Sequence, residues 1–188
     1  MSPDEESAFE TDSLGLVGRR LPEVTLPTAS GKIISFSRES DKWTVLFCYP
    51  GDGLGERHPH LAGCTAEANG FREAFRDIVA AGARVYGLST QHTTHQTKFH
   101  KNNRLNFDLL SDKNLKFATG LGLPTDEVEG GTILLRLTLV ADPQRIIKKV
   151  FFPVHDPSGH PREVLQFLRS VTGSSSGPLP DPEGVERM

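Results

Sequence analysis

The segment from residue 44 to residue 76 constrains the fold of this chain most, because it joins a strand pattern to a helix pattern through one loop. Its first six residues, Thr44–Tyr49, are mostly β-branched or aromatic, which is typical of a buried strand. Pro50 ends this run, and a loop rich in glycine follows. Beyond the loop, hydrophobic residues recur at helical spacing and predict one buried helix face. They are Phe71, Phe75, Ile78 and Val79.

Cys64 stands where this predicted helix begins. The first backbone N–H groups of a helix have no partner inside the helix, and the positive end of its dipole lies there too. Both effects favour the thiolate, which is the form of cysteine that reacts. We therefore expect Cys64 to have a lowered pKa and to be reactive. The alternative is an ordinary buried cysteine in a purely structural domain.

Downstream of this helix, strand and helix patterns alternate. Arg84–Ser89 predicts a second buried strand, so the helix would connect a parallel pair of strands. Two β-rich runs, Thr132–Ala141 and Arg145–Val154, flank a hairpin turn at residues 142–144. The other predicted elements are an N-terminal hairpin over 21–36, a polar helix over 92–103, a short extended piece over 107–110, a short helix over 114–121, and a last helix from Pro161 with Val164, Leu165, Leu168 and Val171 as its apolar face.

This order predicts an α/β protein with a thioredoxin-like fold, in which a mixed central sheet has helices on both faces. A chain of 188 residues is long enough for one domain with a full core. We assign this domain to residues 15–172. The acidic residues 1–14 and the Ser-, Gly- and Pro-rich residues 173–188 are predicted to be disordered.

Composition argues against several classes of function. The net charge is −3, and Lys and Arg form no long basic block, so we expect no nucleic-acid binding. No apolar run approaches the roughly 20 residues that span a bilayer. The first residues lack the apolar stretch of a secretory signal, and two cysteines do not make a disulfide scaffold, so we expect a cytoplasmic protein. We expect no cofactor and no metal, because the histidines of residues 92–100 lack further ligands at suitable spacing.

Four motifs occur in order along the chain, and they are TVLFCYP, GCTAEANGFRE, GLST, and RLTLVAD followed by RIIKKVFFPV. In these motifs the chain resembles the peroxiredoxins, in particular the alkyl hydroperoxide reductase/thiol-specific antioxidant and bacterioferritin comigratory protein types. The resemblance covers Leu21 to Leu168 and is most specific at GCTAEA. It implies an enzyme that reduces hydroperoxides through Cys64, with a small-molecule or protein thiol as reductant. It also implies pairing into a homodimer.

Arg136 is the second residue that the sequence singles out, because an arginine at the start of a core strand is unfavourable unless it is paired. In peroxiredoxins the arginine at this place, six residues before the aspartate of the hairpin turn, faces the thiolate. Arg136 and Asp142 keep this spacing. Glu67, three residues after Cys64, matches the family glutamate that positions this arginine. A cation held beside sulfur lowers the thiol pKa and orients the peroxide.

The loop before Cys64 departs from the family. Three residues upstream of the cysteine, where the family has a hydroxyl that binds the peroxide, this chain has Leu61, and the loop is longer. Losing that hydrogen bond costs about 1–3 kcal/mol, or roughly tenfold to a hundredfold in rate. Pro50 matches the family proline, and we assign Pro50 and Gly63 to peroxide binding. His60, in the enlarged loop, is a candidate replacement donor.

The resolving cysteine is also missing from its usual place. Many relatives carry it five residues after the peroxidatic cysteine, where this chain has Asn69. The other cysteine, Cys48, lies inside the predicted strand on the face opposite Phe47 and Tyr49, as a core residue. An external thiol would then reduce the sulfenic acid, which is the one-cysteine mode, unless the loop unfolds and Cys48 resolves it. The missing groups leave an alternative function, a peroxide or redox sensor or binding module with little turnover.

Overall fold

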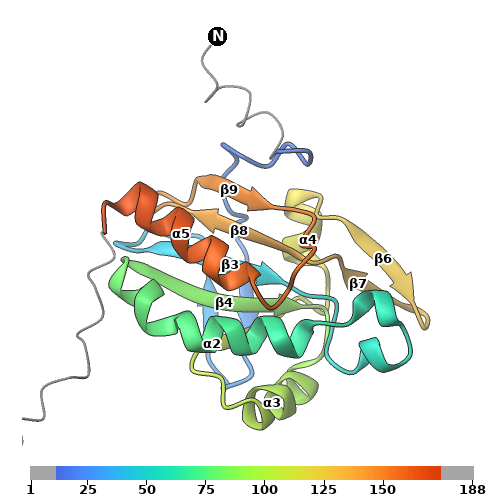
Figure 1. Cartoon of the computed structure of the whole chain (residues 1–188). Helices are drawn as coiled ribbons and strands as arrows, with labels where there is room; N and C mark the ends of the chain where they lie inside the picture. The colour runs from blue at the N-terminus through green and yellow to red at the C-terminus, as the bar shows by residue number, and fades with distance from the viewer. Residues whose placement is uncertain (1–11, 175–188) are drawn as a thin grey trace, which may run out of the picture.

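The computed structural model describes residues 12–174 of the chain, and Figure 1 shows a central sheet with helices packed on it. The segments predicted to be disordered, 1–14 and 173–188, lie mostly outside the described residues. Residues 12–14 are described, and Asp12 Oδ1 accepts a hydrogen bond from the backbone N–H of Leu16 at 2.8 Å. Within the described part of the chain, no helix is both long and apolar enough to cross a membrane.

The central sheet has five strands in the order β5-β4-β3-β8-β9. Its three parallel strands are β3 (Trp43–Cys48), β4 (Ala83–Ser89) and β5 (Asp108–Ser111). Two antiparallel strands extend it, β8 (Leu137–Ala141) beside β3 and β9 (Ile147–Phe151) beside β8. A separate hairpin is formed by β1 (Thr25–Pro27) and β2 (Ile33–Ser35). This is the mixed α/β sheet that the sequence predicts, with the parallel βαβ unit at its centre.

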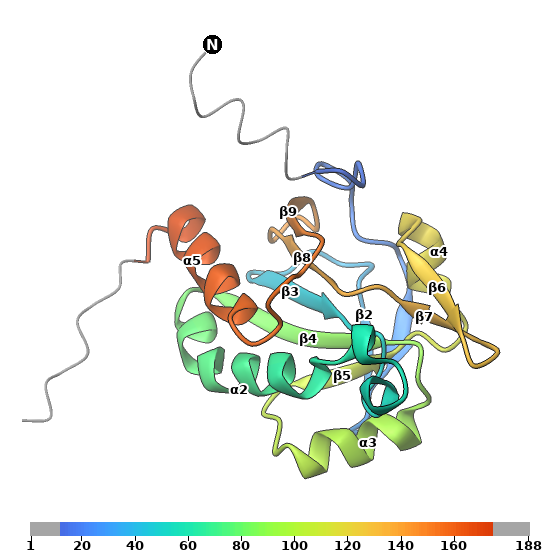
Figure 2. The same ribbon diagram turned by 45° about the vertical axis from the view of Figure 1, so that its right-hand side comes forward.

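Helices cover both faces of this sheet (Figures 1 and 2). The helices are α2 (Cys64–Ala80), α3 (Thr93–Asn102), α4 (Lys116–Leu121) and α5 (His160–Thr172). One core cluster lies under α2 and α5 and includes Phe47, Phe71 and Leu168. The other lies on the opposite face, where α4 and the β1–β2 hairpin pack over residues such as Cys48 and Leu139. β3 therefore contributes alternate residues to two separate cores, which explains its continuous apolar run.

The predicted buried faces of α2 and α5 each include one residue that is exposed in the structure. Val79 of α2 and Val171 of α5 are 44% and 43% exposed, although both were expected to be buried. Phe71 and Ile78, seven residues apart, define the buried face of α2, and Val79 lies about 100° further around the helix. The polar helix over 92–103 is also less exposed than predicted, because Gln96 and Phe99 of α3 are buried.

The predicted strand over 132–141 is two strands in two different sheets. β7 (Gly131–Leu134) pairs with β6 (Thr125–Val128), a strand that the sequence did not indicate because its residues are mostly polar and exposed. The chain rejoins the central sheet only at Leu137, where β8 begins. The two residues between β7 and β8 are Leu135 and Arg136, so Arg136 precedes the core strand.

Candidate active site

The loop between β3 and α2 delivers Cys64 to the first position of the helix. Two short 3₁₀ turns, η1 (Leu54–Glu56) and η2 (Pro59–Leu61), fold this loop back on itself. Gly63 caps α2 with a φ of 114°, a backbone conformation that favours glycine. A Cβ at Gly63 would also lie 2.6 Å from Cγ of Pro157, so the close approach of these two segments requires glycine.

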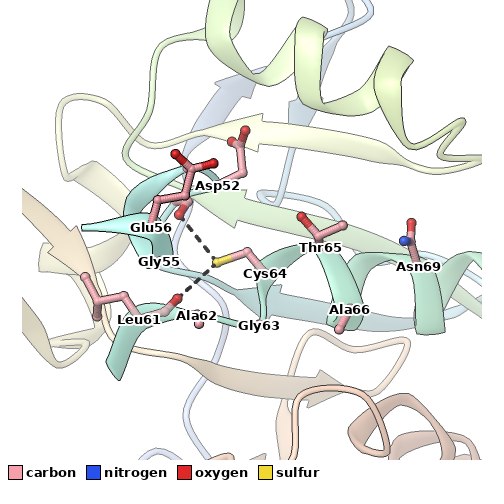
Figure 3. A pocket seen from close by; sticks show the side chains of 12 residues that line it. Asp52, Gly55, Glu56, Leu61, Ala62, Gly63, Cys64, Thr65, Ala66 and Asn69 are labelled. Atoms are coloured by element: carbon pink, nitrogen blue, oxygen red, sulfur yellow. Dashed lines mark hydrogen bonds between the residues drawn. The ribbon is translucent and has the colours of Figure 1, made fainter. Parts of the chain in front are cut away.

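The Cys64 thiol lies at the inner wall of a cavity of about 570 Å³. The residue is only 5% exposed. Its Sγ donates hydrogen bonds to the carbonyl oxygens of Gly51 and Leu61, at 3.5 and 3.8 Å, as the dashed lines in Figure 3 show. Both acceptors belong to the loop, so the conformation of the loop determines where the sulfur lies.

Arg136 and Glu67 complete the group of catalytic residues that the sequence predicts. Arg136 Nη2 lies 3.3 Å from Cys64 Sγ and donates a hydrogen bond to it. Arg136 Nη1 donates to Glu67 Oε2 at 2.7 Å. Glu67 lies on the first turn of α2 and is fully buried. The structure thus brings together three residues that are up to 72 positions apart, with the carboxylate holding the guanidinium against the sulfur.

Arg136 also fixes the end of the loop. Its Nη2 donates to the carbonyl oxygens of Leu61 and Ala62, at 3.2 and 3.3 Å. The residue that replaces the family hydroxyl, Leu61, therefore contributes its backbone to the site while its side chain is buried. One guanidinium connects the sulfur, the buried carboxylate and the loop, which is a use of the fixed fork of five donors that only arginine provides.

Burial is the strongest influence on the ionisation of Cys64. It raises the pKa of the thiol above its ordinary value, and the Arg136 guanidinium opposes this rise without cancelling it. The predicted lowering of the Cys64 pKa is therefore wrong, because the prediction counted the helix end and the arginine but not the loss of water. Burial likewise raises the pKa of Glu67 to about 7, again with Arg136 opposing.

The three predicted substrate-binding residues have different positions. Gly63 lines the cavity beside the thiol. Pro50 is buried two residues beyond the end of β3 and does not line the cavity. His60 is exposed and is absent from the cavity wall, so the structure does not bring this candidate donor to the sulfur. The wall instead includes three polar residues that the sequence did not single out, Asp52, Glu56 and Thr65, together with Asn69, which stands where many relatives carry the resolving cysteine.

Cys48 is separated from Cys64 by the sheet. It is fully buried in the core cluster opposite the one that contains Cys64, as strand alternation predicted, and both cysteines are free thiols. Burial raises the pKa of Cys48 well above its ordinary value, which makes it a poor nucleophile. Within residues 12–174, no three histidine, cysteine, aspartate or glutamate side chains gather as a metal site would require.

Comparison with known proteins identifies relatives along most of the chain. Residues 17–150 match the AhpC/TSA family. The chain is 32% identical over 154 residues to the chloroplastic peroxiredoxin Q of Populus jackii, which covers 82% of this chain and 68% of that protein. It is also 32% identical over 150 residues to the chloroplastic peroxiredoxin Q of Triticum aestivum, with 80% and 65% covered. The chain thus spans about two thirds of the length of these plant relatives.

Solved structures show the same fold. Peroxidoxin BcpB of Mycobacterium tuberculosis has a TM-score of 0.71 at 28% identity, covering 82% of this chain and 97% of that chain. The bacterioferritin comigratory protein of Xanthomonas campestris has a TM-score of 0.70 at 20% identity, covering 83% and 99%. The thioredoxin-like fold is therefore confirmed, and the relatives favour peroxide reduction over a sensor with little turnover. The chain belongs to the AhpC/TSA family, as a thiol-dependent peroxidase of the bacterioferritin comigratory protein and peroxiredoxin Q type.

Proposed function

We propose that Cys64 is the residue of this peroxidase that attacks the hydroperoxide. After losing its proton, the sulfur attacks the terminal oxygen of the substrate, so that an S–O bond forms and the O–O bond breaks. Cys64 becomes a sulfenic acid, and the departing alkoxide takes up a proton and leaves as an alcohol. The observation that carries this proposal is the 3.3 Å contact between Arg136 Nη2 and Cys64 Sγ at the wall of an open cavity.

Arg136 has the catalytic role of stabilising negative charge on sulfur and on the peroxide oxygens. Charge-assisted hydrogen bonds of this kind are stronger than those between neutral groups. The first N–H groups of α2 provide further donors where the oxygens would lie, because helix ends leave these groups unpaired. Glu67 acts through Arg136 and is a positioning residue, since its carboxylate is bonded to the guanidinium and not to the sulfur.

We propose further that Cys64 works in the one-cysteine mode. One external thiol would condense with the sulfenic acid and release water, giving a mixed disulfide. A second thiol would then attack this disulfide, regenerating Cys64 and leaving with the first thiol as an external disulfide. The location of Cys48 supports this mode, because Cys48 and Cys64 belong to the cores on opposite faces of the sheet. An internal disulfide would require α2 to detach from the sheet or β3 to leave it.

The test is peroxide consumption by the purified protein with dithiothreitol as reductant. We expect Cys64→Ser to abolish turnover and Cys48→Ala, the matched change in the other cysteine, to preserve it. Intact mass after one equivalent of peroxide should show one added oxygen in the wild type, and a mixed disulfide once a small thiol is added. A mass lower by two hydrogen atoms without added thiol would instead indicate an internal disulfide. Turnover by Cys64→Ser at the wild-type rate would refute the assignment.

The proposal also includes the oligomeric state of the protein and its location in the cell. A homodimer is expected from the resemblance to the family, and sedimentation of the full chain over a range of concentrations tests it. A cytoplasmic location is supported by the two unpaired cysteines, because thiols persist in reducing compartments. Cell fractionation with the native chain tests this second point. Recovery in an organelle fraction would refute it, and the plant relatives named above are chloroplastic.

A further inference from the structure

Two carboxylates line the cavity that contains the Cys64 thiol. They belong to Asp52 and Glu56, which lie in the loop between β3 and α2. Figure 3 shows both side chains on the same side of the cavity, beside the sulfur. The rest of the wall consists of glycine, alanine and leucine residues together with the neutral polar residues Thr65 and Asn69. A molecule that reaches the sulfur therefore passes these two carboxylates and no basic residue of the cavity wall.

The positive charges near the cavity are already balanced. The Arg136 side chain is only 9% exposed and pairs with Glu67. Arg57, next to Glu56, pairs with Glu129 of the β6–β7 turn and does not line the cavity. His95 Nε2 lies 3.1 Å from Asp52 Oδ1, but it offsets that charge only when the imidazole is protonated. The cavity therefore presents a net negative charge to an incoming substrate.

We propose that Asp52 and Glu56 make the enzyme selective for uncharged hydroperoxides over those that carry a carboxylate. This inference rests on the proposed role of Cys64. Like charges in one water-exposed cavity repel each other, and the repulsion lowers the rate of encounter as well as the occupancy of the site. Each carboxylate should reduce the reaction rate of a substrate with one negative charge by roughly threefold to tenfold at low salt.

Size does not impose this selection. A cavity of about 570 Å³ is within the range that accepts small organic ligands, so an aryl hydroperoxide fits whether or not it carries a charge. The apolar part of the wall, which includes Leu61, Ala62 and Ala66, suits the hydrocarbon portion of such a substrate. The discrimination should therefore depend on ionic strength, as it would not if shape were responsible.

The test compares two substrates that differ in charge and by one methyl group, a carboxylate-bearing aryl hydroperoxide and its methyl ester. The quantity measured is the second-order rate constant of Cys64 oxidation for each, in buffer of low salt. We expect the ester to react roughly tenfold faster or more, and the ester-to-acid ratio to shrink as salt is added. Asp52→Asn and Glu56→Gln should each lower this ratio, and the double variant should bring it close to one.

Glu73→Gln is the matched control. It removes the same charge from an exposed residue of α2 that does not line the Cys64 cavity, so the wild-type ratio should persist. An ester-to-acid ratio near one in the wild type, or a ratio that the double variant leaves unchanged, would overturn the inference while Cys64 remains the reactive residue. If neither substrate oxidises Cys64 faster than a free thiolate, the proposed role of Cys64 falls, and the inference falls with it.

Discussion

Arg136 Nη2 lies 3.3 Å from Cys64 Sγ and joins the residue just before β8 to the first residue of α2. The chain leaves the β6–β7 pair at Leu134 and enters the central sheet at Leu137, so Arg136 falls in the irregular backbone between them. Because Arg136 lies outside the strands, its guanidinium can approach the N-terminal end of α2 instead of lying on a face of the sheet. The contact therefore depends on the break in what the sequence presents as one continuous strand.

Replacing Arg136 by lysine should slow the oxidation of Cys64 even though the charge is kept. Lysine has one compact ammonium, which cannot bond sulfur, Glu67 and the loop carbonyls in the geometry of a planar fork. Losing one hydrogen bond to a charged group costs about 1.5–3 kcal/mol, which corresponds to roughly tenfold to a hundredfold in rate. Stopped-flow measurement of Cys64 oxidation by hydrogen peroxide gives the comparison.

Arg136→Met is the companion variant, because it removes the charge as well. It should be slower than Arg136→Lys, and its thiol pKa should be higher than that of the wild type, since the guanidinium is what opposes the effect of burial. A titration of the thiolate absorbance measures this shift. If both variants oxidise at the wild-type rate, Arg136 has no part in the reaction.

The position of the sulfur also depends on Gly51, whose carbonyl accepts the hydrogen bond from Cys64. Gly51 has a φ of 143°, and a Cβ there would meet Cδ of Gln91 at 2.9 Å. The Gln91 amide Nε2 also donates to the Asp52 carbonyl at 3.4 Å, so the end of β4 supports the loop. We predict that Gly51→Ala displaces the loop and slows Cys64 oxidation.

Gly53→Ala serves as the control for this change. Gly53 also has a positive φ, 82°, but a Cβ there would have no atom within 4 Å. Both variants thus strain the backbone, and only Gly51→Ala forces Gln91 to move. Equal oxidation rates in the two variants, together with equal unfolding free energies, would show that the Gln91 contact does not position the thiol.

The sequence predicted much of the fold because its apolar runs have a simple period. β3, β4 and β8 contribute nearly continuous apolar residues, and a strand buried on both faces needs no other signal. The missed strand β6 and the exposed Val79 have a common cause. Whether β6 forms a strand and whether Val79 is buried both depend on tertiary neighbours. The hydrophobic period of one chain segment does not contain that information.

The proposed catalytic residues could be predicted from the sequence for a different reason. Cys64 and Glu67 belong to one helix, so their spacing places both on its first turn, and a lone arginine before a core strand requires a partner. The cavity wall could not be predicted. Asp52 and Glu56 line it because two 3₁₀ turns fold the loop, and nothing in the pattern of residues 51–63 specifies those turns. The burial that raises the Cys64 pKa was missed with them.

Glu67 should make the stability of the protein depend on pH. Its pKa is raised from 4.5 to about 7 in the folded state, so the native protein binds this proton more tightly than the unfolded chain. The contribution of Glu67 to the free energy of unfolding is therefore greatest below pH 4.5 and is lost as the pH rises to 7. Glu67→Gln removes the titration.

Urea unfolding of the wild type and of Glu67→Gln at several pH values measures this effect. The variant cannot form the ion pair with Arg136, which the wild type forms only where Glu67 is ionised. Relative to the wild type, the variant should become steadily more stable between pH 4.5 and 7, because only the wild type loses the contribution of Glu67 there. A difference between the two proteins that stays flat across this window would contradict the raised pKa.

His160 should act with the opposite sign. It is buried at the start of α5, its Nε2 lies 2.7 Å from Thr138 Oγ1, and its pKa is lowered from 6.5 to about 4. Burial and the nearby charge of Arg136 lower this pKa, whereas Asp156 raises it. The unfolded chain therefore binds this proton more readily than the native protein. The contribution of His160 to the free energy of unfolding should be fully present above pH 6.5 and should be lost as the pH falls toward 4.

Two variants separate this titration from the hydrogen bond that accompanies it. His160→Gln removes the titrating group, so its free energy of unfolding should fall less than that of the wild type between pH 6.5 and 4. Thr138→Val removes the hydrogen bond but keeps the imidazole, so it should be less stable by about 1–3 kcal/mol and should keep the contribution of His160 to the pH dependence. If both variants show the same pH dependence as the wild type, the acid sensitivity arises from other groups. The comparison between variants is needed because the contribution of Glu67 to the free energy of unfolding rises as the pH falls through the same range.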